Sequence, residues 1–327
     1  MRSVTERDGT TTHQSEMTDR MTKPAHPVRP ATGGHGPAFG MAITTVGRWG
    51  HICELLDDLA AQTFPPHMVA IAYDDNEDAA AGLQRVMQEF SHRLTIRTVV
   101  KHGGSTAGHN TAVSLLTDEV DWVYLLTDNC RLEPDLLERL APHCVPPATL
   151  CAMRLVDADG NRNKVPPPGT PFTRRNAWSA VVPAMVISHE HYAAIGGFDT
   201  TIGSGSQSPW QSGDETDLVL KLSMLEDFSV RWIPDIVVTG HTDFTHLTPE
   251  ERRRKLRNYG RGTGYMFRRW NYSKREKMRF LAGAASLPLR EPRKYRLRDG
   301  LVLLIGRSEG ILGRKFTRDS DNRAVLR

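Results

Sequence analysis

The chain has 327 residues, of which 39% are hydrophobic and 24% charged, and its formal net charge is +4. This composition is typical of a globular protein with enough apolar residues for a sizeable core. No apolar run approaches the length that spans a bilayer, and the N-terminal residues lack the apolar core of a secretory signal, so we expect neither segment.

The basic residues are concentrated at one end of the chain. Residues 250–327 hold 23 Lys and Arg against 8 Asp and Glu, a net charge of +15, whereas the remainder holds 19 basic against 30 acidic residues, a net charge of −11. Such a basic segment predicts anionic partners: lipid headgroups, phosphates or nucleic acid. No nucleic-acid-binding motif accompanies the charges, so nucleic acid is the least favoured of the three.

Cysteine usage indicates the cellular compartment. The four cysteines are Cys53, Cys130, Cys144 and Cys151. They form no Cys-x-x-Cys pair, and no histidine pair has zinc-binding spacing. We therefore expect reduced thiols in a cytoplasmic protein.

The first half of the chain alternates apolar strand-like runs with segments of helical spacing. Residues 1–38 are polar and are predicted to be a disordered tail. Strands are then expected at 39–47, 67–78, 94–101 and 122–126, with helices at 51–62, 79–90 and 111–120. This alternation predicts a parallel sheet with right-handed crossovers.

Three of these strands end in polar residues, at Thr44-Thr45, Asp74-Asp75 and Thr127-Asp128-Asn129. Ligands bind beyond the carboxyl ends of parallel strands, so we expect the three clusters to meet along one edge of the sheet. After residue 150 the pattern changes. The remaining expectations are a long loop at 157–176, strands at 177–188 and 230–241, a helix at 214–225 and a mostly helical basic segment after 250.

Several short segments occur in an order typical of one enzyme family. They are AITTVGR, AAQTFPP, DDNED, GGSTAGHN, LLTDNCRLEPD, GGFD, GDETDL and PDIVVTGH. Together they resemble a family 2 glycosyltransferase over residues 40–260. The resemblance implies the α/β GT-A fold, a Rossmann-like, mostly parallel sheet flanked by helices, at 39–250. It further implies a nucleotide-binding half at 39–150, an acceptor half at 151–250 and a basic helical C-terminal extension at 251–327.

The resemblance also implies a divalent cation. In the family a D-x-D motif binds Mg²⁺ or Mn²⁺, which bridges the donor diphosphate, and here the motif reads Thr127-Asp128-Asn129. The implied metal ligands are Asp128, Asn129 and His241, with His246 as a weaker substitute for His241. Because only the middle Asp remains, weaker metal binding is expected. The alternative interpretation of these residues is a polar turn.

A nucleotide site follows from the same resemblance. Asp75 would bind the base edge, and because a carboxylate only accepts hydrogen bonds it suits the N3–H of uracil or thymine, hence a UDP- or dTDP-sugar. The alternative for this acidic pair is an Asx turn. Backbone amides at the start of a helix favour an anion, so the glycine-rich loop GGSTAGHN is expected to contact the donor diphosphate. The implied donor-binding residues are Thr44, Asp74, Asp75, Gly104, His109 and Asp128.

Glu215 aligns with the catalytic Asp of the family. The resemblance therefore implies that Glu215 is the general base of an inverting transfer, with Asp214 and Asp217 as neighbours. The structural alternative is a capping box, because Ser212 stands three residues before Glu215. Trp210 is expected either to stack on the acceptor sugar or to be a buried aromatic.

The sequence thus predicts a glycosyltransferase of the hexosyltransferase type. The acceptor would be a glycan, a lipid-linked intermediate or a small molecule. The basic and aromatic residues of 251–280, including Tyr265, Phe267 and Trp270, would place a cytoplasmic protein at the inner face of an anionic membrane; a solvated basic helix pair is the alternative. A non-catalytic nucleotide-sugar or glycan-binding relative is favoured by the altered D-x-D motif. A nucleotidyltransferase is a further alternative, and it is disfavoured because this sequence lacks the basic glycine-rich signature that such an enzyme has after the first strand.

Overall fold

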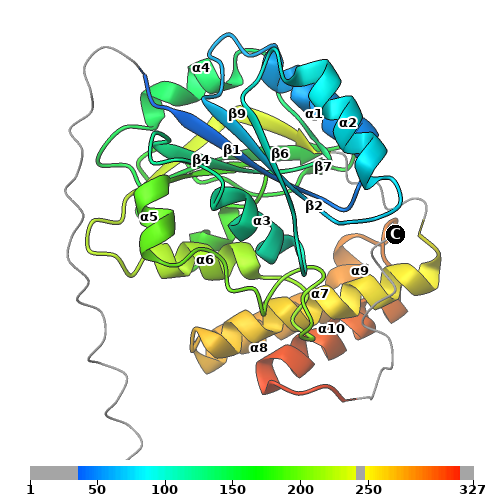
Figure 1. The fold of residues 1–327 in the computed structure, drawn as a ribbon. Helices are drawn as coiled ribbons and strands as arrows, with labels where there is room; N and C mark the ends of the chain where they lie inside the picture. Colours follow the sequence, from blue (N-terminus) through cyan, green and yellow to red (C-terminus); the bar gives the residue numbers. More distant parts are fainter. Residues whose placement is uncertain (1–35, 241–246, 317–327) are drawn as a thin grey trace, which may run out of the picture. The chain divides into compact units, whose positions relative to one another are not determined.

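The computed structural model describes residues 36–240 and 247–316, and within them a nine-stranded sheet is flanked by helices (Figure 1). The strands are β1 (Phe39–Thr45), β2 (Met68–Tyr73), β3 (Ile96–Val100), β4 (Trp122–Thr127), β5 (Cys130–Arg131), β6 (Leu150–Asp157), β7 (Gly160–Asn161), β8 (Met185–Ser188) and β9 (Val230–Gly240). The helices are α1 (Trp49–Ala60), α2 (Ala79–Phe90), α3 (Ser105–Val113), α4 (Leu136–Leu140), α5 (His189–Ala194), α6 (Asp214–Leu222), α7 (Pro249–Arg269), α8 (Lys274–Ala285), α9 (Leu287–Arg290) and α10 (Leu297–Leu312).

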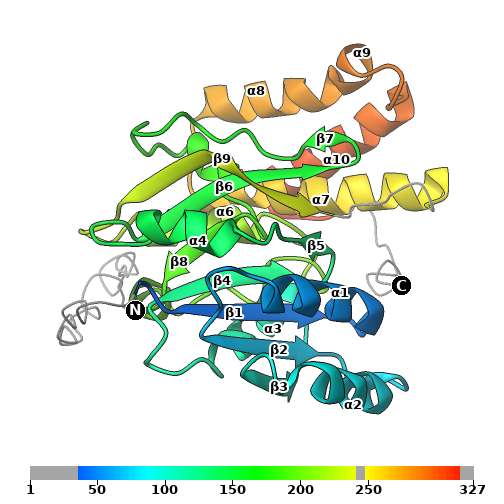
Figure 2. The ribbon, with the colours of Figure 1, turned by 90° about the horizontal axis from the view of Figure 1, so that it is seen from above.

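The sheet is mixed, with a parallel half that matches the predicted α/β class. Its strand order is β3-β2-β1-β4-β8-β6-β9-β5, and β7 pairs with β6. Strands β1 to β4 are parallel to one another, as are β6 and β9, whereas β8 runs antiparallel to both β4 and β6. Figure 2 shows the sheet from above, with the carboxyl ends of β1, β2 and β4 at the same edge.

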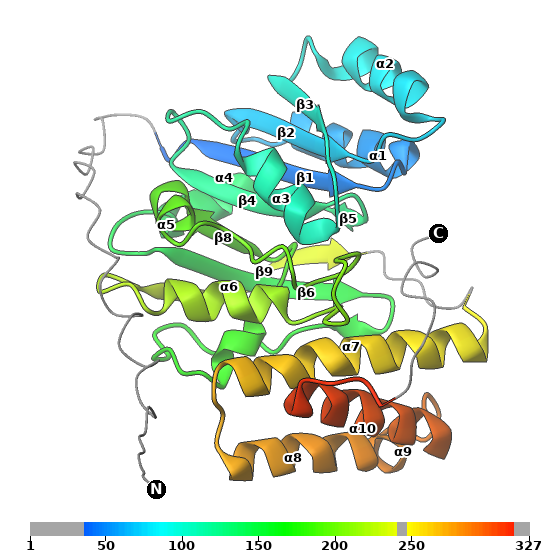
Figure 3. The ribbon, with the colours of Figure 1, turned by 60° about the horizontal axis from the view of Figure 1, so that its bottom comes forward.

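Alternating side chains of β1 serve two cores. Phe39, Met41 and Ile43 are buried in the core that α1, α2 and α4 cover, whereas Ala42 belongs to the core under α3, α5 and α6. Figure 3 shows the second of these layers in front of the sheet. Because successive side chains of a strand point to opposite faces, a strand buried on both sides reads as a continuous apolar run.

Three local predictions differ from the structure. The helix expected from residue 111 begins at Ser105, because Gly104 takes an extended conformation and caps it. Strand β6 lies in a stretch for which no strand was predicted. The strand expected at 177–188 is confined to Met185–Ser188; before it come a short 3₁₀ helix, Asn176–Ser179, and Pro183, which has no N–H to donate to a ladder.

The helices expected after residue 250 are present, and α7 packs closely on α10. A Cβ at Gly264 of α7 would lie 2.3 Å from the carbonyl oxygen of Arg307, and one at Gly306 of α10 would lie 2.3 Å from that of Arg257. Only glycine lets the two helix backbones approach this closely. The basic segment is therefore a packed helical layer.

Buried ion pairs hold the same two helices together. Glu309 of α10 is fully buried, and its carboxylate accepts hydrogen bonds from Arg257 Nη2 and Arg261 Nε of α7, both at 2.6 Å. Arg261 is itself only 1% exposed. Removing one partner of such a pair leaves a buried charge without compensation.

We predict that Glu309→Gln lowers the free energy of unfolding by roughly 3–5 kcal/mol, the usual cost of breaking a buried ion pair. Chemical denaturation of the purified variant measures it. Glu291→Gln, at an exposed position of the same layer, is the control and should change stability by about 0.5 kcal/mol or less. Equal, small effects of both substitutions would contradict the assignment.

Candidate active site

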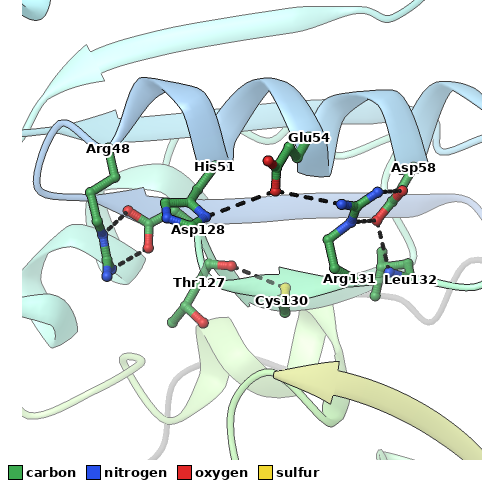
Figure 4. Close-up of polar contacts among 9 residues, drawn as sticks. All are labelled: Arg48, His51, Glu54, Asp58, Thr127, Asp128, Cys130, Arg131 and Leu132. Carbon is green, nitrogen blue, oxygen red and sulfur yellow. Dashed lines mark hydrogen bonds and ion pairs between the residues drawn. The ribbon is translucent and has the colours of Figure 1, made fainter. Parts of the chain in front are cut away.

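The site is organised around a buried ion pair between Arg48 and Asp128. Arg48 follows β1, and its Nε donates to Asp128 Oδ2 at 3.1 Å while its Nη2 pairs with Oδ1. Thr45 Oγ1 also donates to Oδ2, at 2.5 Å. Asp128 is 1% exposed, whereas the Arg48 side chain is 50% exposed. Figure 4 shows the two side chains facing each other, with the Thr127 side chain directed away from them.

In this arrangement Asp128, a predicted metal ligand, is the partner of an arginine. Both of its carboxylate oxygens accept from protein donors. On the other side of the strand end, Thr127 Oγ1 donates to Asn129 Oδ1 at 2.7 Å, and neither side chain carries a charge. Strand β4 ends at Thr127, and the turn that follows brings the side chains of Thr127 and Asn129 together.

The described residues do not fit a divalent cation at this site. Mg²⁺ and Mn²⁺ favour several oxygen ligands, usually with carboxylates among them. Within 36–240 and 247–316 no group of three or more His, Cys, Asp or Glu side chains is placed to hold a metal. His241 and His246, the other predicted ligands, lie outside the described residues.

A second ion pair fixes the far end of α1. Arg131 of β5 donates through Nε and Nη2 to the two carboxylate oxygens of Asp58, at 2.7 and 2.8 Å (Figure 4). The N–H of Leu132 adds a bond to Asp58 at 3.0 Å. Helix α1 is thus bound to the segment after β4 at both of its ends, which restrains the loop that carries Arg48.

The acidic residues after β2 have different environments. Asp74 pairs with the buried Lys101, 2.5 Å from Nζ to Oδ1, whereas Asp75 is exposed. Nearby Thr44 Oγ1 is buried without a hydrogen-bond partner among the described residues, and a Cβ at Gly108 would come within 2.2 Å of it. Of the two carboxylates, Asp75 is therefore the one accessible to a base edge.

Gly104 and His109 of the glycine-rich loop face protein. A Cβ at Gly104 would lie 2.3 Å from the carbonyl oxygen of Ser204, which already accepts a bond from Ser105 N at 2.9 Å. His109 is 2% exposed and its ring lies 5.6 Å from that of Phe198. Burial, with a smaller effect of Lys101, lowers the pKa of His109 to about 4, so the ring is neutral at pH 7. At this helix start the N–H of Ser105 is already bonded to the chain.

Glu215 and Asp214 lie at the start of α6. The residue that caps the helix is Gly213, at φ +89°, and no side chain caps it, so the capping-box alternative for Ser212 and Glu215 does not hold. Instead Glu215 Oε1 accepts a hydrogen bond from Val182 N at 2.9 Å. Burial raises the pKa of both carboxyl groups, and the charge of Asp214 raises that of Glu215 further. Raised carboxyl pKa values suit proton transfer near neutral pH.

Asp217, the third predicted catalytic residue, has a structural role. It is 1% exposed, and Oδ1 accepts a hydrogen bond from Trp270 Nε1 and forms an ion pair with Arg269 Nε, each at 2.9 Å. These bonds tie α6 to the end of α7. Trp210 stacks on Tyr265 of α7, with ring centroids 4.5 Å apart and an angle of 4°, so one of its faces is covered.

Four residues not predicted from the sequence interact with one another, and one of them, Tyr259, is also close enough to the carboxylates of Asp214 and Glu215 to respond to their charge. Arg48 follows β1, Arg162 follows the β6–β7 hairpin, and Lys255 and Tyr259 come from α7. Partial burial and the charges of Asp214 and Glu215 raise the pKa of Tyr259, and Arg162 acts on it in the opposite direction. In the sequence, only Arg48 had a local signal, the Gly-Arg pair after the first strand. The positions of the other three residues depend on tertiary packing.

Comparison with known proteins gives the fold a name. No protein-family model and no curated protein matches the sequence. Among solved structures, the mannosyltransferase PcManGT from Pyrobaculum calidifontis, in complex with GDP-Man and Mn²⁺, is similar with a TM-score of 0.57 and 13% identity, over 86% of this chain and 89% of that one. S. aureus TarS residues 1–349 in complex with UDP-GlcNAc gives 0.51 and 13%, over 87% and 95%. The chain therefore has the fold of the GT-A glycosyltransferases.

Proposed function

We propose that the chain is a glycosyltransferase that moves a sugar from a nucleoside diphosphate donor to an acceptor hydroxyl. The observation that carries the proposal is the carboxylate pair Asp214 and Glu215, with raised pKa values, in a GT-A fold. Solved structures of that fold bind UDP-GlcNAc and GDP-Man, which supports a donor of this class. The sheet edge formed by β1, β2 and β4 would hold the nucleotide, with Asp75 at the base.

Glu215 is the proposed general base. Its carboxylate is oriented by the bond from Val182 N and would remove the proton of the acceptor hydroxyl as that oxygen attacks the anomeric carbon. Attack opposite the leaving diphosphate would invert the configuration. Asp214 keeps the pKa of Glu215 high and so raises its affinity for that proton. The family's Mg²⁺ or Mn²⁺ would polarise the diphosphate, but the described residues do not fit it, and this proposal uses no metal step.

We expect Glu215→Gln to lower the transfer rate by about 10²- to 10⁴-fold, the usual contribution of a general base. Glutamine retains an oxygen that accepts from Val182 N, so the local fold is preserved. The assay measures release of UDP, dTDP or GDP from a panel of their sugar conjugates. Glu190→Gln, an exposed position on α5, is the control and should leave the rate unchanged. An unchanged transfer rate in Glu215→Gln would show that Glu215 is not the general base.

The pH profile gives an independent test. A general base acts when deprotonated, so kcat/KM should rise with pH through the pKa of Glu215, and burial places that pKa above the ordinary carboxyl range. Below it the rate should fall by about tenfold per pH unit. In Glu215→Gln this limb should vanish. An acid limb at an ordinary carboxyl pKa, or one that persists in the variant, contradicts the assignment.

We also propose that the basic helices contact an anionic membrane, the surface from which a lipid-linked acceptor would be reached. The aromatic residues expected at the interface are packed inward: Phe267 is 8% exposed and Trp270 bonds to Asp217. The most exposed apolar residues of this segment are instead Leu289 and Leu297, each 77% exposed. Their exposed basic neighbours are Arg290, Arg293, Arg296 and Arg298. Within the described residues no helix is long and apolar enough to cross a bilayer.

Co-sedimentation with phosphatidylglycerol vesicles tests this contact. The chain should bind them at low salt and leave phosphatidylcholine vesicles unbound. Replacing Leu289 and Leu297 together by Ser should weaken binding about tenfold or more, because each buried leucine contributes about 1.5–3 kcal/mol. Met224→Ser is the control, since Met224 is 73% exposed on the loop after α6. Binding that both lipids support equally would count against the proposal.

A further inference from the structure

The geometry points to a cationic cluster of Arg48, Arg162 and Lys255 that binds the donor diphosphate without a divalent cation. This inference rests on the proposed function and assigns the chemistry of its diphosphate subsite. A leaving diphosphate needs its negative charge neutralised, and the described carboxylates do not assemble a metal site for the purpose. Fixed positive side chains can supply the same stabilisation.

The sheet register brings the two arginines to one edge. Thr44 of β1 pairs with Thr127 of β4, which places the loop bearing Arg48 beside Asp128. Across the neighbouring strands Cys130 pairs with Gly240, and Thr239 pairs with Val156. Asp157 follows Val156 and holds Arg162. Residues far apart in the sequence therefore meet along this edge.

Each arginine is oriented by a buried carboxylate. Arg48 is held by Asp128, and Arg162 Nε lies 3.2 Å from Asp157 Oδ2, whose side chain is 0% exposed. The arginine side chains themselves are 50% and 34% exposed. Both guanidinium groups are thus fixed on their inner edge while part of each faces solvent. Arginine in this state is preorganised to bind phosphate oxygens.

Lys255 reaches the same region from α7. Ser212 Oγ donates to the carbonyl oxygen of Tyr259 at 2.7 Å, which holds this part of α7 against the start of α6. Lys255 lies one turn earlier, with Nζ 5.5 Å from the centroid of the Tyr259 ring. The third cation therefore lies on the part of α7 that is held against the start of α6.

The three positive charges act on one another. Burial, and then the charges of Arg162 and Arg48, lower the pKa of Lys255 to about 8. A diphosphate bound beside these side chains would offset the repulsion that they exert on Lys255 and would raise the pKa of the lysine. On the facing strand end, Thr127 and Asn129 bring no negative charge to oppose it.

Isothermal titration of the full chain with UDP, dTDP and GDP, in EDTA and in MnCl₂, tests the inference. At least one nucleotide should bind, with affinities that agree within about twofold in the two buffers. Lys255→Met should weaken that binding by about tenfold or more in both, since a hydrogen bond to a charged group contributes about 1.5–3 kcal/mol. Arg162→Met should do the same. Lys274→Met and Arg275→Met, exposed on α8, are the controls and should bind as the parent does.

Inorganic pyrophosphate in EDTA separates this inference from the proposed function, because it lacks base and sugar. If pyrophosphate binds the parent chain but not Lys255→Met, and no nucleotide binds, the cationic cluster is supported and the transferase proposal is overturned. Nucleotide binding that requires Mn²⁺ and is unaffected by Lys255→Met would overturn the cluster and leave the transferase standing. If nothing binds in either buffer, both are overturned. Circular dichroism of each variant confirms that it is folded, and Lys255→Arg should restore affinity.

Discussion

The ion pair between Arg48 and Asp128 is the interaction on which the site depends. A carboxylate buried at the end of β4 would be costly if it were left alone, and the bidentate guanidinium offsets that cost. The same contact joins the loop after β1 to the end of β4, and Arg131 with Asp58 fixes the other end of α1. A structural requirement of the fold therefore places a half-exposed positive charge at the sheet edge where the donor is proposed to bind.

The carboxylates of the chain divide into two groups by what surrounds them. Asp74, Asp128 and Asp217 are each paired with a lysine or an arginine. Burial raises the pKa of Asp214 and Glu215, and the charge of Asp214 raises that of Glu215 further. Sequence motifs treat all five as candidate site residues, and only their partners distinguish the chemistry that each can perform.

The fold was largely predictable, because strand and helix periodicities reflect local burial, which the sequence records directly. The contacts of the candidate site residues were not predictable in the same way. The sequence placed polar residues at the ends of three strands, but it did not predict that Arg48 reaches Asp128. Likewise the partner of Asp217 is Arg269, 52 positions away, and no local pattern links them. Gly104 was predicted to lie in a phosphate-binding loop. A small residue allows the close approach of a ligand or of a protein backbone equally well, and in the structure the backbone of Ser204 lies there.

The basic helices belong to the site as much as to any surface. Helix α7 supplies Lys255 and Tyr259 on one side, and on the other it is held to α10 by glycine contacts and by Glu309. The position of Lys255 therefore depends on the buried ion pairs that hold its own helix to α10. By charge alone this segment resembles a membrane-binding tail. In the proposed function, its helix α7 would also supply a cation to the donor, and the two roles require different faces of the same helices.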